Sequence, residues 1–223
     1  MSNTVISLAK GGVVNLSKHT PGLTNLTVGL GWTPASENNV GQAADTGKKK
    51  GFLSKLFGGD DSDSRPTPSG EYDLDAFVLL LQDGVYVHES DSTIYYGHKD
   101  HSTGCVHHHG DNLVGGGNGD DEQISIKLDA VPAKYNKLVI AVNIYRGIEK
   151  HQSFGDITKA FIRLVNNKDN QEMCRYDISK DSDYKDKTAL VLGFLERVNG
   201  EWEFKASGDA YRVHSIADLA DKF

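Results

Sequence analysis

Acidic residues gather in one part of the chain, where their types and spacing suggest metal chemistry. Residues 71–123 contain eleven Asp or Glu residues but a single Lys or Arg, which is Lys99. The first acidic group covers residues 73–75 and the second covers residues 110–122. Close carboxylates without a cation repel one another by roughly 1–4 kcal/mol per pair. This part of the chain therefore requires a counter-charge.

The spacing of these acids favours a calcium site. Asp73 and Asp75 are two residues apart, so their side chains would leave a strand on the same side. Glycines within residues 115–119 allow a tightly curved backbone that exposes carbonyl oxygens. Calcium takes six to eight oxygen ligands from carboxylates, amides, carbonyls and water. We predict a calcium site formed by Asp73, Leu74, Asp75, Asp111, Asn112, Asn118, Asp120, Asp121 and Glu122.

Two other interpretations stay open at this point. A run of acids is most often a solvated surface, although such a surface needs neither the glycines nor the asparagine. In a strand His107 and His109 would share a face, where they could chelate zinc or copper with His98 or His101. That arrangement would suggest a metal-dependent enzyme acting on an oxyanion. The histidines could instead be solvated or bond to loop carbonyls. The histidines of this part of the chain are His88, His98, His101, His107, His108 and His109.

Several function classes have no support in the sequence. The formal net charge of -7 argues against a nucleic-acid-binding protein, which needs a basic surface to displace counterions. The chain contains no G-x-S-x-G nucleophile motif, no P-loop and no C-x-x-C motif. The acids after the glycine-rich residues 115–119 would repel a phosphate group. We therefore expect a binding protein without catalytic residues.

The elements that must position the acids are strands. Apolar and polar residues alternate at many places, as a half-buried strand requires, and segments 138–145 and 189–195 are apolar on both faces, which indicates central strands. The pattern predicts an all-β, two-sheet antiparallel β-sandwich of about ten strands. The predicted strands cover residues 13–16, 26–32, 72–81, 104–109, 124–128, 138–145, 161–165, 172–176, 189–195 and 202–206.

Turns and short helices complete this prediction. Asn199-Gly200 stands between two strand patterns and favours a type I′ turn, in which both central residues have positive φ. Residues 167–170 form a plausible hairpin loop. Ser215 followed by Asp218 resembles a capping box, so a short helix should close the chain. A second short helix is expected near Ser153.

Residues 41–70 interrupt the strand pattern within an otherwise single domain that spans residues 1–223. They are rich in Gly, Ser, Pro and charge, which predicts a flexible insertion. Apolar and basic residues between positions 48 and 57 could form an amphipathic turn that contacts a membrane or a partner weakly. So short a helix is marginal on its own, so a surface loop is the simpler interpretation.

The remaining features favour the cytoplasm. No apolar run approaches the roughly 20 residues that a membrane-spanning helix needs, and the N-terminus lacks the pattern of a secretory signal. Cys105 and Cys174 are too few for a disulfide framework, so we expect two buried thiols. We predict a cytoplasmic protein that contacts the inner face of the membrane at most peripherally.

Motifs along nearly the whole chain outside residues 41–70 resemble those of the TerD family. The two acidic motifs, DLDA at residues 73–76 and the segment 110–122, are the most specific of them. The other matching segments are LAKGG (8–12), NLSK (15–18), PGL (21–23), VGLGW (28–32), FG (154–155), AFIR (160–163) and GEW (200–202).

The resemblance implies a β-sandwich with two calcium positions at the acidic loops. It also implies a role in bacterial resistance to tellurite and other stresses, with protein partners in a resistance complex and no established catalytic mechanism. The sequence departs from the family where Thr-Gly-Glu-Gly-Asp-Gly becomes Val-Gly-Gly-Gly-Asn-Gly at residues 114–119. One acid is lost and Asn118 replaces an Asp, so we expect weaker binding at one of the two positions.

Overall fold

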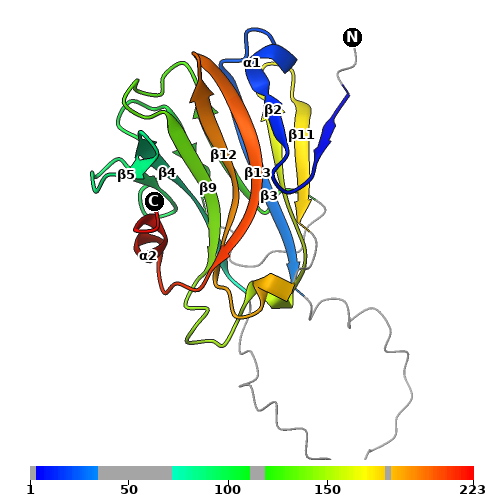
Figure 1. The fold of residues 1–223 in the computed structure, drawn as a ribbon, viewed down its shortest axis with the longest axis vertical. Coiled ribbons are helices and arrows are strands. Elements are labelled where there is room, and N and C mark those ends of the chain that lie inside the picture. Colours follow the sequence, from blue (N-terminus) through cyan, green and yellow to red (C-terminus); the bar gives the residue numbers. More distant parts are fainter. Residues whose placement is uncertain (1–3, 35–71, 111–118, 179–181) are drawn as a thin grey trace, which may run out of the picture.

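The computed structural model describes residues 4–34, 72–110, 119–178 and 182–223. In these ranges two sheets pack against each other, as Figure 1 shows. The first sheet has six strands in the order β1-β11-β10-β3-β8-β7. The second has seven, in the order β2-β13-β12-β9-β4-β5, with β6 also paired to β4. The predicted two-sheet sandwich is confirmed.

All ten predicted strands are present, together with three short ones that the alternation did not indicate, β1, β5 and β6. These three strands have only two or three residues each, too few for a period of two to stand out. β2 and β7 are also only three residues long, but they lie within longer predicted segments, residues 13–16 and 104–109. β1 also pairs in parallel with β11, whereas an antiparallel sandwich was expected. The first sheet contains β1 (Ile6–Leu8), β3 (Asn25–Pro34), β7 (Val106–His108), β8 (Glu122–Lys127), β10 (Ile157–Asn166) and β11 (Gln171–Ile178). The second contains β2 (Val13–Asn15), β4 (Leu74–Gln82), β5 (Val85–Tyr86), β6 (Thr93–Ile94), β9 (Lys137–Ile144), β12 (Ala189–Val198) and β13 (Glu201–Tyr211).

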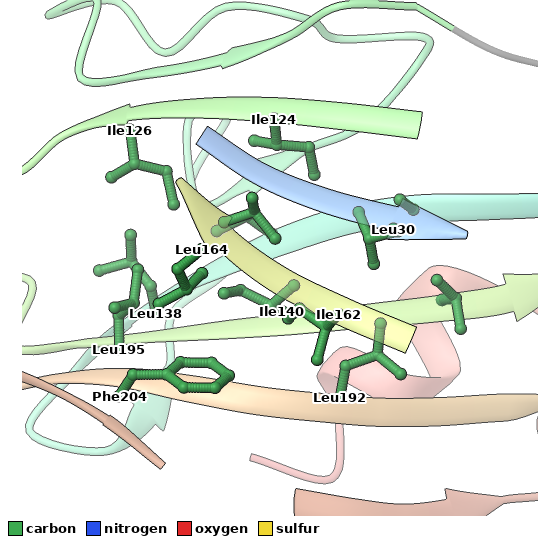
Figure 2. Close-up of a cluster of buried hydrophobic side chains, with 14 of the residues drawn as sticks. Leu30, Ile124, Ile126, Leu138, Ile140, Ile162, Leu164, Leu192, Leu195 and Phe204 are labelled. Carbon is green, nitrogen blue, oxygen red and sulfur yellow. The ribbon is translucent and has the colours of Figure 1, made fainter. Parts of the chain in front are cut away.

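The main core lies between the two sheets. Figure 2 shows part of this core, to which Leu30 and Ile124 contribute from the first sheet and Ile140 and Phe204 from the second. Each of these side chains is at most 1% exposed. Complete burial of one such side chain contributes about 1.5–3 kcal/mol, so this layer holds the sheets at a fixed separation. The loops at the ends of the sandwich therefore have fixed starting points.

A second, smaller hydrophobic cluster covers the outer face of the second sheet. Phe77 and Leu79 of β4 are fully buried on that face, under the short helix α2 (Ile216–Ala220). The Ser215 hydroxyl caps α2 by accepting a hydrogen bond from the Asp218 amide, as the sequence predicted. Because both of its faces are covered, β4 is buried over nearly its whole length.

The turns and remaining helices follow local chemistry. Asn199 and Gly200 have φ of 51° and 82°, which confirms the predicted hairpin turn between β12 and β13. A short 3-10 helix, η3 (Phe154–Asp156), follows Ser153 as expected. The helical turn α1 (Leu16–His19) was not predicted, and it begins because the Asn15 side chain accepts a hydrogen bond from the Lys18 amide. A further 3-10 helix, η4, covers Ser182–Tyr184.

Both cysteines are free and buried, as predicted. Burial raises the pKa of the Cys174 thiol to about 12, so the thiol is protonated and unreactive at neutral pH.

The predicted insertion at residues 41–70 lies outside the described residues. Among the residues that the structure describes, no helix has the length and apolar character needed to cross a membrane.

Candidate functional site

The two acidic motifs meet at the backbone of Ala76, the residue that follows Asp75. The Glu122 carboxylate accepts a hydrogen bond from the Ala76 amide, with 2.6 Å between Oε2 and N. On the same residue, the Ala76 carbonyl oxygen lies 3.1 Å from Nε2 of His108. Both side chains are fully buried. A polar link therefore crosses from the first sheet to the edge of β4, between segments 46 residues apart in the chain.

The hydrogen bonds of His108 define its protonation state. Nδ1 accepts a hydrogen bond from the Gly110 amide at 3.1 Å, so it carries no proton. Nε2 must then carry the proton and donate it to the Ala76 carbonyl oxygen, which makes the imidazole neutral. The chain on both sides of residues 111–118 is thus held at Ala76, by His108 on one side and Glu122 on the other.

Asp120 points to the opposite side from Glu122, onto the outer face of the first sheet. Its carboxylate receives two hydrogen bonds from the Arg163 guanidinium, at 2.7 Å from Nε and 3.0 Å from the second nitrogen. The Asp120 side chain is 1% exposed, and these bonds raise the pKa of Arg163. Arg163 also reaches Glu172 at 3.2 Å. In the structure the charge of Asp120 is therefore balanced by an arginine.

A glycine in β3 makes room for this ion pair. A Cβ atom placed on Gly29 would lie 2.3 Å from the Asp120 carboxylate. Any larger residue at this position would push the carboxylate away from Arg163. The absence of a side chain at Gly29 is thus what allows Asp120 to lie flat on the sheet.

Asp121 takes a third direction. Its carboxylate accepts a hydrogen bond from the Trp32 amide at 2.8 Å, and its own amide donates to the Leu30 carbonyl. Three consecutive acids at the start of β8 therefore have three different surroundings. The simple convergence of carboxylates expected from the sequence does not extend to Asp120, whose partner is Arg163.

The first acidic motif is divided between the core and the outer face of the second sheet. The Leu74 side chain is buried in the main core, so only its backbone carbonyl could reach a cation. Asp75 is 4% exposed and lies opposite Asn143 of β9, on the outer face of the sheet. The Asp73 carbonyl accepts a hydrogen bond from the Tyr145 amide. Three further predicted ligands, Asp111, Asn112 and Asn118, lie outside the described residues.

The donor chemistry of these residues fits a calcium ion. Asp73, Asp75 and Glu122 offer hard oxygen ligands, and the Glu122–Ala76 hydrogen bond brings the two motifs together. Across the described ranges, no group of three or more His, Cys, Asp or Glu residues could hold a metal ion. The predicted calcium site, which includes residues 111, 112 and 118, stays a prediction.

The histidines separate into buried and surface members. His107 of β7 and His109, directly after the strand, lie side by side as predicted, with their ring centroids 4.8 Å apart. His107 bonds to Asp100 and His109 to Ser125. The two possible third ligands lie elsewhere. His98 pairs with Asp91, and the buried His101 accepts hydrogen bonds from Thr103.

Sequence reasoning missed the residues that position the acids, namely Arg163, Gly29 and the role of His108. One signal was available, because Gly29 and Gly31 occupy alternate positions in a strand. Glycines on one face of a strand often mark a close approach by another group. The sequence held no signal that would have assigned that group to Asp120.

Comparison with known proteins agrees with this architecture. The TerD domain family matches residues 4–223. A tellurium resistance protein TerD from Serratia marcescens is 39% identical, covering 92% of this chain and 91% of that protein. The stress response protein SCP2 of Bacillus subtilis is 38% identical and covers 98% of both chains. General stress protein 16U of the same organism is 38% identical, over 93% of this chain and 91% of that one.

A solved structure shares the fold at lower sequence identity. The homologue of telluride resistance protein (TerD) SCO6318 from Streptomyces coelicolor has a TM-score of 0.58 and is 17% identical. The match covers 89% of this chain and 96% of that one. Because the family match spans residues 4–223 and relatives above 30% identity cover nearly the full length, this chain belongs to the TerD family.

Proposed function

We propose that this protein is a calcium-organised binding module that takes part in resistance to tellurite and in the general stress response. The names of its relatives support the biological role, since they include tellurium resistance and stress response proteins. The calcium part rests on the chemistry of the acidic motifs and on the contacts that bring them together.

The observation that carries the proposal is the double hydrogen bond at Ala76. His108 and Glu122 fix the two ends of the acidic loop to the strand that carries Asp75. In this proposal, residues 111, 112 and 118 would add further oxygen ligands to those of the first motif. A divalent cation would neutralise these oxygens and make the loops rigid.

Each residue has a separate role in this proposal. Asp73 and Asp75, with the Leu74 carbonyl, would supply ligands from β4. Asp111, Asn112 and Asn118 would supply them from the loop, and Asp121 and Glu122 from the start of β8. Asp120, which Arg163 already holds, would act through its charge at the edge of the site. The ordered loops would then form the contact surface for a protein partner.

Calcium binding can be tested by thermal unfolding in calcium and in chelator. A cation at a hundredfold excess over its dissociation constant, bound only to the folded state, adds about 2.7 kcal/mol of stability. We expect a higher melting temperature in calcium, and we expect Asp111→Asn with Asp121→Asn to remove the difference. Asp129→Asn, an exposed acid outside the two motifs, is the control. Equal melting temperatures of the native protein in calcium and chelator would exclude the site.

The biological role needs a separate experiment. We expect the gene to restore growth on tellurite to a sensitive bacterial strain that lacks its own relatives of this protein. The Asp111→Asn/Asp121→Asn variant should restore less growth than the Asp129→Asn control at equal protein level. Equal growth with both would separate tellurite resistance from calcium binding.

A weak membrane contact through residues 41–70 needs its own test. Liposome co-sedimentation of a variant without residues 41–70 is compared with that of the native protein.

A further inference from the structure

A cavity of about 270 Å³ opens beside α1, at the end of the sandwich that is uppermost in Figure 1. Two segments line it. Residues 20–25 form the turn between α1 and the start of β3, and residues 166–168 are the end of β10 with the first part of the hairpin loop. No Asp or Glu is among these lining residues, although the chain as a whole carries a net charge of -7.

Asn166 brings a hydrogen-bond donor to the cavity. The residue lines the cavity and is only 6% exposed. Its Oδ1 atom accepts a hydrogen bond from the Lys168 amide at 3.0 Å, which fixes the orientation of the side-chain amide. In the described part of the chain, no atom accepts a hydrogen bond from its Nδ2. Buried amide groups normally have hydrogen-bond partners, so this Nδ2 calls for an acceptor within the cavity.

The neighbouring polar side chains also leave donors rather than acceptors. Oδ1 of Asn25 accepts a hydrogen bond from Nδ2 of Asn167 at 3.0 Å, and Oδ1 of Asn167 accepts one from the Thr27 hydroxyl at 2.8 Å. The buried Thr20 hydroxyl has no hydrogen-bond partner among the described residues. The amide oxygens of the lining asparagines are therefore all used within the protein, whereas the Nδ2 group of Asn25 is left to donate.

Lysine gives this end of the sandwich a positive charge. Lys168 lines the cavity, and its ammonium group forms no ion pair within the described ranges. Lys127 of β8 lies directly opposite Asn25 of β3, so a second lysine is close by. The acid next in sequence, Asp169, does not line the cavity, and its carboxylate accepts a hydrogen bond from the Gln171 amide. Donors and a lysine without an acid in the lining favour an anionic ligand.

We propose that this cavity binds a phosphate group, either as the free anion or as part of a small phosphate ester. Its oxygens accept hydrogen bonds from Nδ2 of Asn166 and of Asn25, and the Lys168 ammonium balances its charge. The oxygens of a phosphate group point in several directions, which suits donors that come from two separate segments. A volume of about 270 Å³ also leaves room for the alcohol part of an ester.

The inference is independent of the proposed function, because the two sites lie at different positions along β3. Glu122 is paired with Leu30, five residues beyond Asn25, which corresponds to about 17 Å at the rise of a strand. Phosphate also binds calcium in solution, so the titration uses protein from which calcium and chelator have both been removed. A failure of the phosphate site then leaves the calcium proposal untouched, and the reverse also holds.

The experiment is a titration of the isotopically labelled full chain, followed by amide NMR shifts at constant pH and ionic strength. The probes are inorganic phosphate and glycerol 3-phosphate, with glycerol and chloride as controls. We expect saturable shifts at residues 20–25 and 166–168 with both phosphate compounds, little change at α2, and no saturable shifts with glycerol or chloride. Tighter binding of glycerol 3-phosphate would identify an ester as the ligand, and equal binding would identify the free anion.

Two variants alter the donors while keeping the size of the side chains similar. Asn166→Asp retains an oxygen for the Lys168 amide but replaces the donor by a carboxylate oxygen, so it should weaken binding by at least about tenfold. Lys168→Gln removes one exposed charge and should weaken binding by about two- to fivefold. Lys222→Gln changes an exposed lysine after α2 and should bind like the native protein.

The amide spectrum of each variant reports whether it is folded, and Lys168→Gln alters only an exposed loop side chain. The proposal is overturned if neither phosphate compound causes saturable shifts at residues 20–25 and 166–168, or if chloride causes the same shifts. It is equally overturned if Asn166→Asp and Lys168→Gln both bind phosphate as tightly as the native protein.

Discussion

The segment from residue 100 to residue 123 has two sides with different physical roles. On the inner side, His101, His108 and Glu122 are buried, and the last two bond to the backbone of Ala76. On the outer side, Asp120 pairs with a partly exposed arginine, and His107 and His109 contact solvent. Residues of the same type thus bond to the backbone between the sheets on one side, and to side chains of the outer face on the other.

This difference shows that the number of acidic residues in a motif does not determine the structural role of each one. Glu122 replaces a missing strand partner at the edge of β4, so its bond supports the sandwich itself. Asp120 is held by one ion pair over Gly29, and the sheet beneath it is complete without it. We therefore expect substitutions on the inner side to destabilise the fold strongly, and those on the outer side to do so mildly.

The largest effect is expected for Glu122→Ala. This change leaves the buried Ala76 amide without its acceptor and opens a cavity beside His108, which together should destabilise the protein by about 2–4 kcal/mol. Urea unfolding monitored by fluorescence measures the change. Glu172→Ala is the matched control on the outer face, because it removes one bond to Arg163 and should change stability by less than about 1 kcal/mol. Equal losses for the two glutamates would contradict the division into two sides.

Gly29→Ala should have an intermediate effect. The new methyl group would overlap the Asp120 carboxylate, and overpacking of this kind destabilises by about 1–3 kcal/mol. Combining it with Asp120→Ala removes the overlap, so the double variant should be no less stable than Asp120→Ala alone. Gly119→Ala is the control, since a Cβ at that position meets no atom within 4 Å. If the double variant loses as much stability as the two single variants together, the overlap with Asp120 is not the reason for a glycine at position 29.

The Asp120–Arg163 pair should have a smaller effect. A double-mutant cycle with Asp120→Asn and Arg163→Lys should give a coupling energy of about 1 kcal/mol, because lysine cannot form the two parallel bonds of the guanidinium. The coupling should fall at high salt, since Arg163 is 30% exposed. Measurement of the cycle in low and high salt tests this. A larger coupling energy that does not change with salt would show that this pair behaves like the buried contacts of Glu122 and His108.

The sequence predicted most of the fold because strands of five or more residues show their alternation directly. The eight strands of six or more residues in the described part of the chain, the Asn199-Gly200 turn and the Ser215 cap follow from local chemistry in this way. The parallel pairing of β1 with β11 could not be predicted, because it joins residues 168 positions apart, such as Ile6 and Cys174, and because β1 has only three residues. Local patterns carry no information about such partners.

The candidate site was less predictable for a related reason. The spacing of Asp120 and Glu122 suggests a shared face, but the Asp121 amide bonds to Leu30 and the regular strand begins only at Glu122. The chain therefore turns between the two acids. Arg163 is 43 residues from Asp120, and nothing in either neighbourhood links them in the sequence. The types of ligand were visible in the sequence, whereas their directions depend on the tertiary structure.

The smallest expected effect concerns the inner histidine His101 and the dependence of stability on pH. Burial lowers the pKa of His101, and the nearby Lys134 and His98 lower it further while Asp91 opposes them. In the unfolded chain the imidazole titrates near its usual pKa of 6.5. The unfolded state therefore binds a proton more readily, and the stability should decrease as the pH falls below about 6.5.

The substitution His101→Gln should reduce this loss of stability between pH 7 and pH 5. The difference in slope should be at most about 1.4 kcal/mol per pH unit, the limit for one proton. Urea unfolding at several pH values measures it, with His107→Gln as the control for removal of a surface histidine. If His101→Gln and the native protein lose stability in parallel, then protonation of His101 is tolerated in the fold. The fold would in that case depend on the Glu122 carboxylate but tolerate a proton on His101. The contrast between the inner and outer sides would then rest on Glu122 and His108 alone.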